Sequence, residues 1–543
     1  MKENQQNPYN HPPQGGQMPP LAPIPPQMGM PGMVYGAQRQ RRPNAAAKAI
    51  FPQWLSRNAL IMYFMALAVV TFMYSAYSLP WYYILSGVVA VMVFFLYGST
   101  AIKDTSLDKI RKESRFEKQI FLIAFIPRVI WMFLIYTIFM NSYGDAFGFE
   151  NADATYYDTL GQFVAGLIRN GNSHFYDEIT KWSGSDELSD MGYGIYVGLI
   201  YLIFGSEGIE GTVGDGGSPT AIIALRLMKC VWSSLTVILI YRLAKRNFDT
   251  QTARVAAIFC ALWPNFWYYC SAHLKETEMV FLTVLFVEQA DQMLRSRQFT
   301  LWKVVPVLLI AAALFTLRTP LGMVAILALL FSIVMSSSRV VSWGKRIIVG
   351  GLAMGLVAVV AGNQLEEKAK GLLAQQENQQ KEGINWYATR KDGSGNQQSF
   401  AKYAGTAVFA PLIFTLPFPS MVRPFEGQEV QQLNNGGNFV KNIISGFTIF
   451  AMIMLLMSGK WRDHLLPLSF MLGYLAVLAL SSFAHSERFH QPVMPFEFMF
   501  AAYGLSIAVT KPKYKRWFTY WCGLMFVANI MWNWFKIAGR GLS

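Results

Sequence analysis

The sequence predicts an all-α polytopic membrane protein, and three observations support this fold class. Apolar residues make up 53 % of the 543-residue chain and charged residues only 14 %, with a mean hydropathy of +0.28. Apolar runs of about 18 residues or more, each long enough to cross a bilayer core of about 30 Å, recur along the chain. Lysine and arginine gather in short clusters between these runs. Because backbone groups in lipid must be hydrogen-bonded within their own segment, we expect the runs to be helices.

The composition also argues against two other classes. A net charge of +14 is typical of nucleic-acid-binding proteins. Here the basic residues lie at the ends of apolar runs, as the positive-inside rule expects, so we predict no nucleic-acid partner and membrane lipid as the surroundings. The four cysteines (Cys230, Cys260, Cys270 and Cys522) lie in or beside apolar runs and lack metal-ligand spacing. We therefore expect neither a disulfide framework nor a cysteine metal site.

The N-terminal part divides into two regions. Residues 1–47 are rich in Pro and Gln and cannot bury enough apolar surface to fold, which predicts a disordered tail. This tail ends in a cluster of arginines, so we place it in the cytoplasm. Residues 48–118 contain two predicted spans and a loop with six Lys and Arg residues between 103 and 118. That basic loop predicts a second cytoplasmic segment.

Hydropathy and charge asymmetry together predict about thirteen transmembrane helices. We interpret residues 119–362 as a core region and residues 439–543 as a set of C-terminal spans, with a second outer region at 363–438 between them. The predicted spans are 58–78, 81–102, 119–140, 220–243, 252–271, 276–294, 301–317, 320–337, 344–362, 441–458, 465–483, 492–509 and 517–535.

The first outer loop, 141–218, is acidic. Its first part, 141–190, has nine Asp and Glu residues against Arg169 and Lys181. The apolar stretch 191–204 is followed by a loop without Lys or Arg, which is not expected of a cytoplasmic loop. We therefore predict that 191–204 is a juxtamembrane helix lying at the outer interface.

Two carboxylates in this loop are candidate catalytic residues. Asp153 begins an amphipathic stretch, and Asp145 lies close to the end of the third span. A carboxylate at the membrane surface can act as a general base toward an acceptor hydroxyl or amine, aided by partial desolvation. The alternative for Asp153 is a purely structural role as a helix cap.

Basic residues at the outer ends of later spans are candidate ligands for a phosphate. Lys275, Arg318, Arg488 and His485 all fall at predicted outer boundaries. Arginine binds phosphate through paired donors. The alternative is that these side chains snorkel to lipid headgroups. No cluster of His, Cys and Asp with metal-ligand spacing accompanies His485, so we assign no metal ligands.

Several segments, in order, resemble the GT-C membrane glycosyltransferases, in particular protein O-mannosyltransferases and lipid A aminoarabinose transferases. The matching segments are Asp153-Ala-Thr-Tyr-Tyr157 with Leu160, Gly192 to Gly205, Ala224-Leu-Arg226 to Arg246, Trp263-Pro264 to Thr277, Leu317-Arg318-Thr-Pro320, and Glu487-Arg488 to Pro495.

This resemblance implies a GT-C-like fold and a glycosyltransferase that uses a polyprenyl-phosphate-linked sugar donor. By position it gives Asp153 the role of base, with Asp145 as a second candidate, and it gives Lys275, Arg318 and Arg488 the donor phosphate. The acceptor would be a glycan, a lipid or a protein, and a divalent cation stays open as a cofactor. The active site would face the extracytoplasmic side of a plasma (inner) membrane.

Two other functions compete with this interpretation. A polysaccharide polymerase shares the substrate class and the sidedness, and the sugar-chain length of the product would distinguish it. A lipid-linked oligosaccharide transporter would need ionisable residues at mid-membrane. The predicted spans contain few such residues, which disfavours transport.

Overall fold

The computed structural model describes residues 52–99, 113–183, 191–205, 218–296, 301–337, 340–342, 344, 346–347, 351, 412–424, 429–480, 486–510 and 512–538. The chain divides into two compact units, Met1–Arg41 and Arg42–Ser543, and every described residue belongs to the second. The predicted tail 1–47, the predicted span 344–362 except for a few residues, and 363–411 therefore lie outside the described residues.

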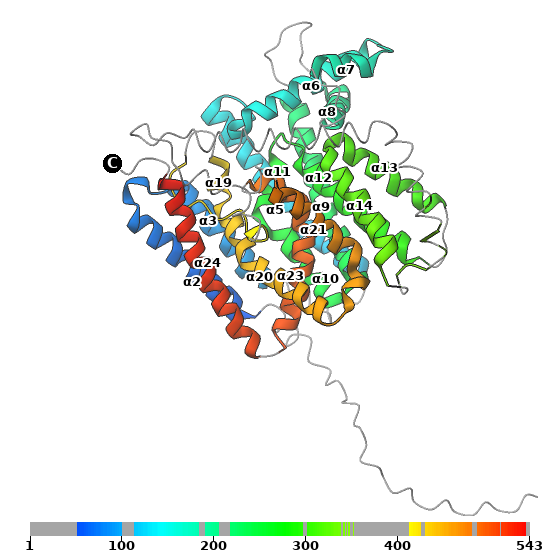
Figure 1. Ribbon diagram of the computed structural model, residues 1–543. Coiled ribbons are helices and arrows are strands. Elements are labelled where there is room, and N and C mark those ends of the chain that lie inside the picture. The colour runs from blue at the N-terminus through cyan, green and yellow to red at the C-terminus, as the bar shows by residue number, and fades with distance from the viewer. Residues whose placement is uncertain are drawn as a thin grey trace, which may run out of the picture. The chain divides into compact units, whose positions relative to one another are not determined.

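The described part is helical, apart from short turns, the irregular segment 412–424 and one isolated antiparallel bridge between Ser78 and Val422 (Figure 1). Its N-terminal helices are α2 (Gln53–Met73), α3 (Trp81–Met92), α5 (Glu113–Tyr143), α6 (Asn151–Arg169), α7 (Phe175–Ser183), α8 (Met191–Phe204) and α9 (Pro219–Asn247). They are followed by α10 (Thr250–Leu262), α11 (Pro264–Ser271), α12 (Glu276–Arg295), α13 (Leu301–Leu317) and α14 (Thr319–Met335). The C-terminal helices are α19 (Glu429–Leu433), α20 (Asn435–Met457), α21 (Leu465–Leu480), α22 (Glu487–His490), α23 (Met494–Ala508) and α24 (Pro512–Ala538).

The remaining elements are single turns of other helix types. The 3-10 turns are η1 (Ser75–Tyr77), η3 (Gly148–Glu150), η5 (Lys460–His464) and η6 (Gln491–Val493), and η2 (Val93–Tyr97) is a π-helical continuation of α3.

Five described helical segments are long and apolar enough to cross a membrane: Gln53–Met73, Ser114–Tyr143, Pro219–Asn247, Asn435–Met457 and Lys460–Leu480. Five more apolar helical segments are shorter, between 10 and 17 residues. Together they agree with a multi-pass membrane protein, whereas the count of about thirteen spans stays a prediction. The predicted juxtamembrane helix 191–204 forms α8 with the same bounds, and it packs against α6, α9 and α13.

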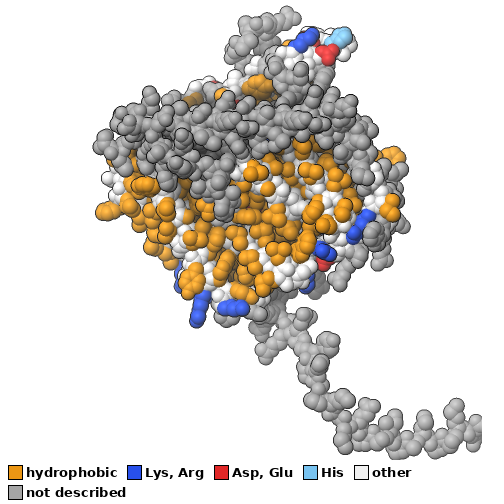
Figure 2. All heavy atoms as spheres, viewed as in Figure 1, with side chains coloured by type: hydrophobic (Ala, Val, Ile, Leu, Met, Phe, Trp, Pro, Cys, Tyr) orange, Lys and Arg blue, Asp and Glu red, His pale blue; other side chains and the backbone are white. Residues whose placement is uncertain are grey.

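The surface of the described helices carries the apolar side chains that a lipid environment requires. Large hydrophobic residues such as Phe72, Trp302 and Met457 are almost fully exposed. Figure 2 shows hydrophobic side chains spread over the helices of the face in view, with Lys and Arg mainly toward the bottom of the view and basic, acidic and histidine side chains at its top. A soluble protein would not expose so large an apolar area, and such a surface is normally covered by lipid or by another protein.

One predicted span is broken. Residues 252–271 form two helices, α10 and α11, separated at Trp263. Pro264 occupies the first turn of α11 and cannot donate a backbone hydrogen bond to the preceding turn, so α10 ends and a new helix begins. The break places α11 beside α5, α9 and α12.

The segment 412–424, inside the predicted second outer region, runs through the interior without forming a helix. Its residues 415 to 422 are buried. Asn442 of α20 donates to the carbonyl oxygens of Thr415 (2.5 Å) and Pro417 (3.2 Å), and Asn533 of α24 accepts from the backbone N–H of Met421 (2.6 Å). Irregular backbone away from water needs such side-chain partners because it lacks the regular hydrogen bonds of a helix or a sheet.

Candidate active site

Three charged side chains from distant parts of the chain meet at the end of the bundle that carries α6. The guanidinium group of Arg488 on α22 is ion-paired through Nη1 with Asp153 of α6 and through Nε with Glu276 of α12. The side chain of Asp153 is 53 % exposed, that of Arg488 is 17 % exposed and that of Glu276 is 1 % exposed. The cluster therefore extends from the protein interior to the surface.

Helix starts place both carboxylates. Asp153 lies in the first turn of α6, and Glu276 is the first residue of α12. Free backbone N–H groups and the positive end of the helix dipole stabilise a carboxylate at these positions. The alternative interpretation of Asp153 from the sequence was a purely structural role as a helix cap. Its ion pair with Arg488 gives it a contact outside its own helix.

Two further cations, Lys275 and Arg318, lie beside these three side chains. Lys275, immediately before α12, is buried, donates to the carbonyl oxygen of Leu317 at 3.0 Å, and lies 5.7 Å from the ring centroid of Tyr157. Arg318, at the start of α14, lies over the ring of Phe489 with its guanidinium carbon 4.0 Å from the centroid. Because Leu317 precedes Arg318, the Lys275 contact ties the start of α12 to the connection between α13 and α14.

The environment of Lys275 lowers its pKa to about 7. Burial, which penalises the charged ammonium group, is the main cause. The carboxylates of Glu276 and Asp153 oppose the shift, while the neighbouring Arg318 and Arg488 add to it. Lys275 is thus a cation that can lose its proton near neutral pH.

The structure brings together four of the six residues that the sequence singled out: Asp153, Lys275, Arg318 and Arg488. His485 lies outside the described residues. Asp145 has a different environment, because its Oδ1 accepts from the backbone N–H groups of Phe147 (2.6 Å) and Gly148 (3.0 Å). Those bonds stabilise the turn that leads into α6.

The sequence did not single out Glu276 as a site residue. The structure pairs Glu276 with Arg488, 212 positions away. Its second oxygen, Oε2, has no hydrogen-bond partner among the described residues. The signal in the sequence was a carboxylate at the start of a long apolar helix, where an unpaired charge is costly.

A second buried polar group lies on α9, next to the same connection. Lys229 contacts the carbonyl oxygen of Leu274 and lies 3.7 Å from Glu278. Arg226, one turn earlier, is fully buried and donates to the carbonyl oxygen of Ala146 at 2.5 Å. Both cations hold the backbone on either side of the site, so the start of α12 and the turn before α6 are anchored to one helix.

A small cavity, with a volume of about 10 Å³, lies beside Glu276 and is lined by residues of α9, α11, α12 and η6. This is about the space that one water molecule needs. Its lining residues are Ser233, Thr236, Phe266, Tyr269, Glu276, Thr277, Val280 and Gln491.

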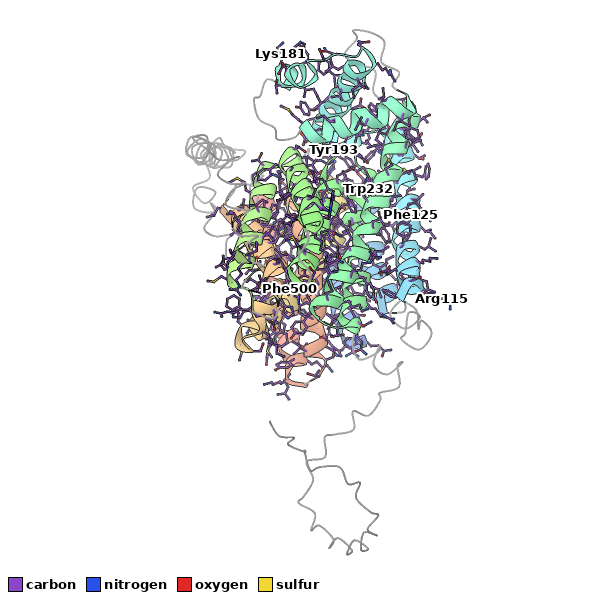
Figure 3. The ribbon with its side chains drawn as sticks, turned by 90° about the vertical axis from the view of Figure 1, so that its right-hand side faces the viewer. Arg115, Phe125, Lys181, Tyr193, Trp232 and Phe500 are labelled. Atoms are coloured by element: carbon purple, nitrogen blue, oxygen red, sulfur yellow. The ribbon has the colours of Figure 1, made fainter. Side chains whose placement is uncertain are left out.

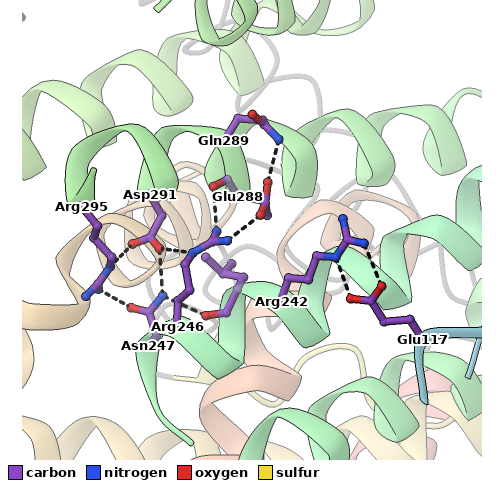
Figure 4. Close-up of polar contacts among 9 residues, drawn as sticks. Glu117, Arg242, Arg246, Asn247, Glu288, Gln289, Asp291 and Arg295 are labelled. Atoms are coloured by element: carbon purple, nitrogen blue, oxygen red, sulfur yellow. Dashed lines mark hydrogen bonds and ion pairs between the residues drawn. The ribbon is translucent and has the colours of Figure 1, made fainter. Parts of the chain in front are cut away.

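The opposite end of the described helices carries a separate ion-pair network (Figure 4). Arg246 of α9 contacts Glu288 (2.7 Å) and Asp291 (3.1 Å) of α12, and Arg295 contacts Asp291 at 2.9 Å. Figure 3 labels Arg115 at this end and Lys181 of α7 at the other. Here every carboxylate is matched by an arginine, which is typical of a structural network.

Among the described residues no three His, Cys, Asp or Glu side chains are grouped so that they could hold a metal ion. The carboxylates of Asp153 and Glu276 share one arginine, Arg488.

The apolar helices and the family comparison together support a membrane glycosyltransferase of the GT-C type. Residues 219–362, from α9 to beyond α14, match the model of the dolichyl-phosphate-mannose-protein mannosyltransferase family, a GT-C superfamily domain. Lys275, Glu276 and Arg318 lie within the matched residues, and Asp153 and Arg488 lie outside them. Comparison with curated proteins and with solved structures yields no match.

Proposed function

We propose that this protein transfers a sugar from a polyprenyl-phosphate donor to an acceptor at the extracytoplasmic face of the plasma (inner) membrane, with Asp153 as the base. The single observation that carries the proposal is the meeting of Asp153 with Arg488, beside Lys275 and Arg318, at one end of the helices. A base and a set of cations are the two components that transfer from a phosphate-linked sugar requires.

The reaction is an inverting single displacement. The acceptor hydroxyl or amine attacks the anomeric carbon of the sugar while the bond from that carbon to the phosphate oxygen breaks. The proton of the acceptor passes to Asp153, and the electron pair leaves with the polyprenyl phosphate. Arg488, Lys275 and Arg318 stabilise the charge that develops on this leaving group, and the acceptor is a glycan, a lipid or a protein.

The ion pair between Arg488 and Asp153 implies that donor binding comes before proton transfer to Asp153. In the structure Arg488 holds the carboxylate of the proposed base. A donor phosphate competes for the same guanidinium group, because arginine binds phosphate through paired donors as well as it binds a carboxylate. Binding of the donor would therefore release Asp153 to accept a proton, and the base would stay engaged until the donor has arrived.

The distribution of charge supports the proposed sidedness. Arg242, Lys245 and Arg246 end α9 at the end opposite the cluster, and α12 ends there in Arg295. Lys and Arg are enriched on the cytoplasmic side of membrane proteins. The end that carries Asp153 and the acidic loop is then extracytoplasmic.

The test is a transfer assay on purified protein with a panel of radiolabelled polyprenyl-phosphate sugars, comparing wild type with Asp153→Asn. A matched control is Asp177→Asn, because Asp177 is an acidic residue of the same outer loop with a side chain 65 % exposed. We expect label to leave the lipid with wild type and with the control, and not with Asp153→Asn. Retained transfer in Asp153→Asn would remove Asp153 as the base, and no turnover of any donor would contradict the proposed function.

A further inference from the structure

The short helix α22 connects the candidate site to three other parts of the protein. Arg488 reaches Asp153 and Glu276, and the next residue, Phe489, packs under Arg318. On either side of them Glu487 and His490 are buried and face α20. The position of Arg488 is thus determined by how α22 is fixed to α20.

Glu487 forms the more extensive of these attachments. Its Oε1 accepts from Asn434 Nδ2 at 2.6 Å and from the Tyr269 hydroxyl at 3.4 Å, and its Oε2 accepts from Asn438 Nδ2 at 2.6 Å. Asn438 is oriented in turn, because its Oδ1 accepts from Asn265 Nδ2 at 3.0 Å. Both asparagine side chains therefore offer donors to the carboxylate, which only a group with two acceptor oxygens can satisfy.

The other attachment is formed by His490 and holds the opposite end of α22. His490 Nδ1 lies 2.8 Å from Lys441 Nζ, and Lys441 also contacts the carbonyl oxygen of Leu416. Lys441 lies 3.8 Å from Glu497 of α23. The buried segment 412–424 is thus joined to the same helix.

We propose that Glu487 is a positioning residue, which holds Arg488 in place for the donor phosphate through its hydrogen bonds with Asn434 and Asn438. This inference rests on the proposed function. It adds that Asn434 and Asn438, at the start of α20, have a role in the site. Glu487 faces away from the reacting groups and acts through Arg488. A misplacement of a site residue by about 1 Å can reduce a rate by about 100-fold.

The chemistry of this network allows a sharp test by exchanging an amide and a carboxylate. Glu487→Gln places an amide donor against the donor of Asn438, which breaks the network. In the double variant Glu487→Gln/Asn438→Asp, the new amide at 487 donates to the carboxylate at 438, while Asn265 still donates to 438. The hydrogen bonds and the single negative charge are restored with the two groups exchanged.

The measurements are kcat and KM for the donor, together with binding of polyprenyl monophosphate as a probe. We expect kcat/KM to fall by about 10- to 100-fold in Glu487→Gln, with weaker binding of the probe, and to recover by about tenfold or more in the double variant. A matched control is Glu288→Gln, because Glu288 is a buried carboxylate in the network at the opposite end. The control should lower thermal stability and leave KM unchanged.

Two outcomes would overturn the inference. One is a double variant that stays as impaired as Glu487→Gln although it is folded. The other is a Glu487→Gln variant whose loss of activity only follows its loss of stability, as for the control.

A further measurement separates this inference from the proposed function. If Glu487 holds Arg488 in its ion pairs, the effects of Glu487→Gln and Arg488→Gln on the free energy of unfolding should not add up in the variant that combines these two changes. Additive effects would overturn the positioning role even if transfer is confirmed. Non-additive effects without any transfer would support it while contradicting the proposed function.

Discussion

Arg488 pairs with one exposed and one buried carboxylate. The loss in free energy of unfolding when Arg488 is replaced follows from this difference in burial. In Arg488→Gln the side chain of Glu276, 1 % exposed, loses its ion-pair partner. An uncompensated buried charge costs about 3–5 kcal/mol. The pair with Asp153, whose side chain is 53 % exposed, contributes about 0–1 kcal/mol. We therefore expect the free energy of unfolding to fall by about 3–5 kcal/mol, almost all of it through Glu276.

The assay is equilibrium unfolding in detergent, arranged as a double-mutant cycle. Replacing both partners, in Arg488→Gln/Glu276→Gln, removes the buried charge together with its partner. We expect a smaller loss than in Arg488→Gln alone and a coupling free energy of about 2 kcal/mol. The control is Arg242→Gln, because Arg242 is 50 % exposed and pairs with Glu117 through two hydrogen bonds of 2.8 Å, so its loss costs about 0–1 kcal/mol. A loss in Arg488→Gln no larger than in this control would refute the reasoning.

Three further predictions concern Lys275, the opposite end of the helices and the core. The pKa of Lys275 is lowered to about 7, so donor affinity should weaken as the pH rises through 7, and Lys275→Arg should remove this dependence in a binding titration. Because the folded-state pKa lies below the usual value of 10.5, this group adds to the free energy of unfolding as the pH rises from about 7 to 10.5, which a pH series of unfolding would show. Arg246→Gln removes a cationic partner from two buried carboxylates and should cost about 3 kcal/mol in unfolding with the KM for donor unchanged; a changed KM would contradict a purely structural network. Gly504→Ala places a methyl group 2.1 Å from the backbone oxygen of Phe447, so it should separate α23 from α20 and cost about 1–3 kcal/mol, and a wild-type melting temperature would contradict this packing.

Much of the helical organisation follows from local pattern and could be predicted. The stretch 191–204 becomes α8 with the expected bounds, because apolar composition and length act within the segment itself. The break at Pro264 inside a predicted span was not predicted, although proline is its local cause. The burial of 412–424 could not be predicted, because it depends on asparagine side chains contributed by α20 and α24.

The candidate site shows the same division. Position at predicted span ends singled out Lys275, Arg318 and Arg488, the acidic outer loop singled out Asp153, and the resemblance suggested their roles. The partnership of Glu276 with Arg488 could not be predicted, because the two residues are 212 positions apart and only the packing of α12 against the elements around α22 joins them. A pattern within one helix carries no information about such long-range pairs.

The account assigns two distinct roles, a base at Asp153 and a phosphate ligand at Arg488, and single-turnover sugar transfer over a range of donor concentrations tests both at once. We predict that Asp153→Asn loses the maximal rate and half-saturates at a donor concentration no higher than that of wild type, because the neutral amide no longer competes with the donor phosphate for Arg488. We predict that Arg488→Gln needs at least about tenfold more donor for half-saturation, because a charge-assisted contact worth about 1.5–3 kcal/mol is lost. A wild-type maximal rate in Asp153→Asn, or unchanged half-saturation in Arg488→Gln, would contradict the account.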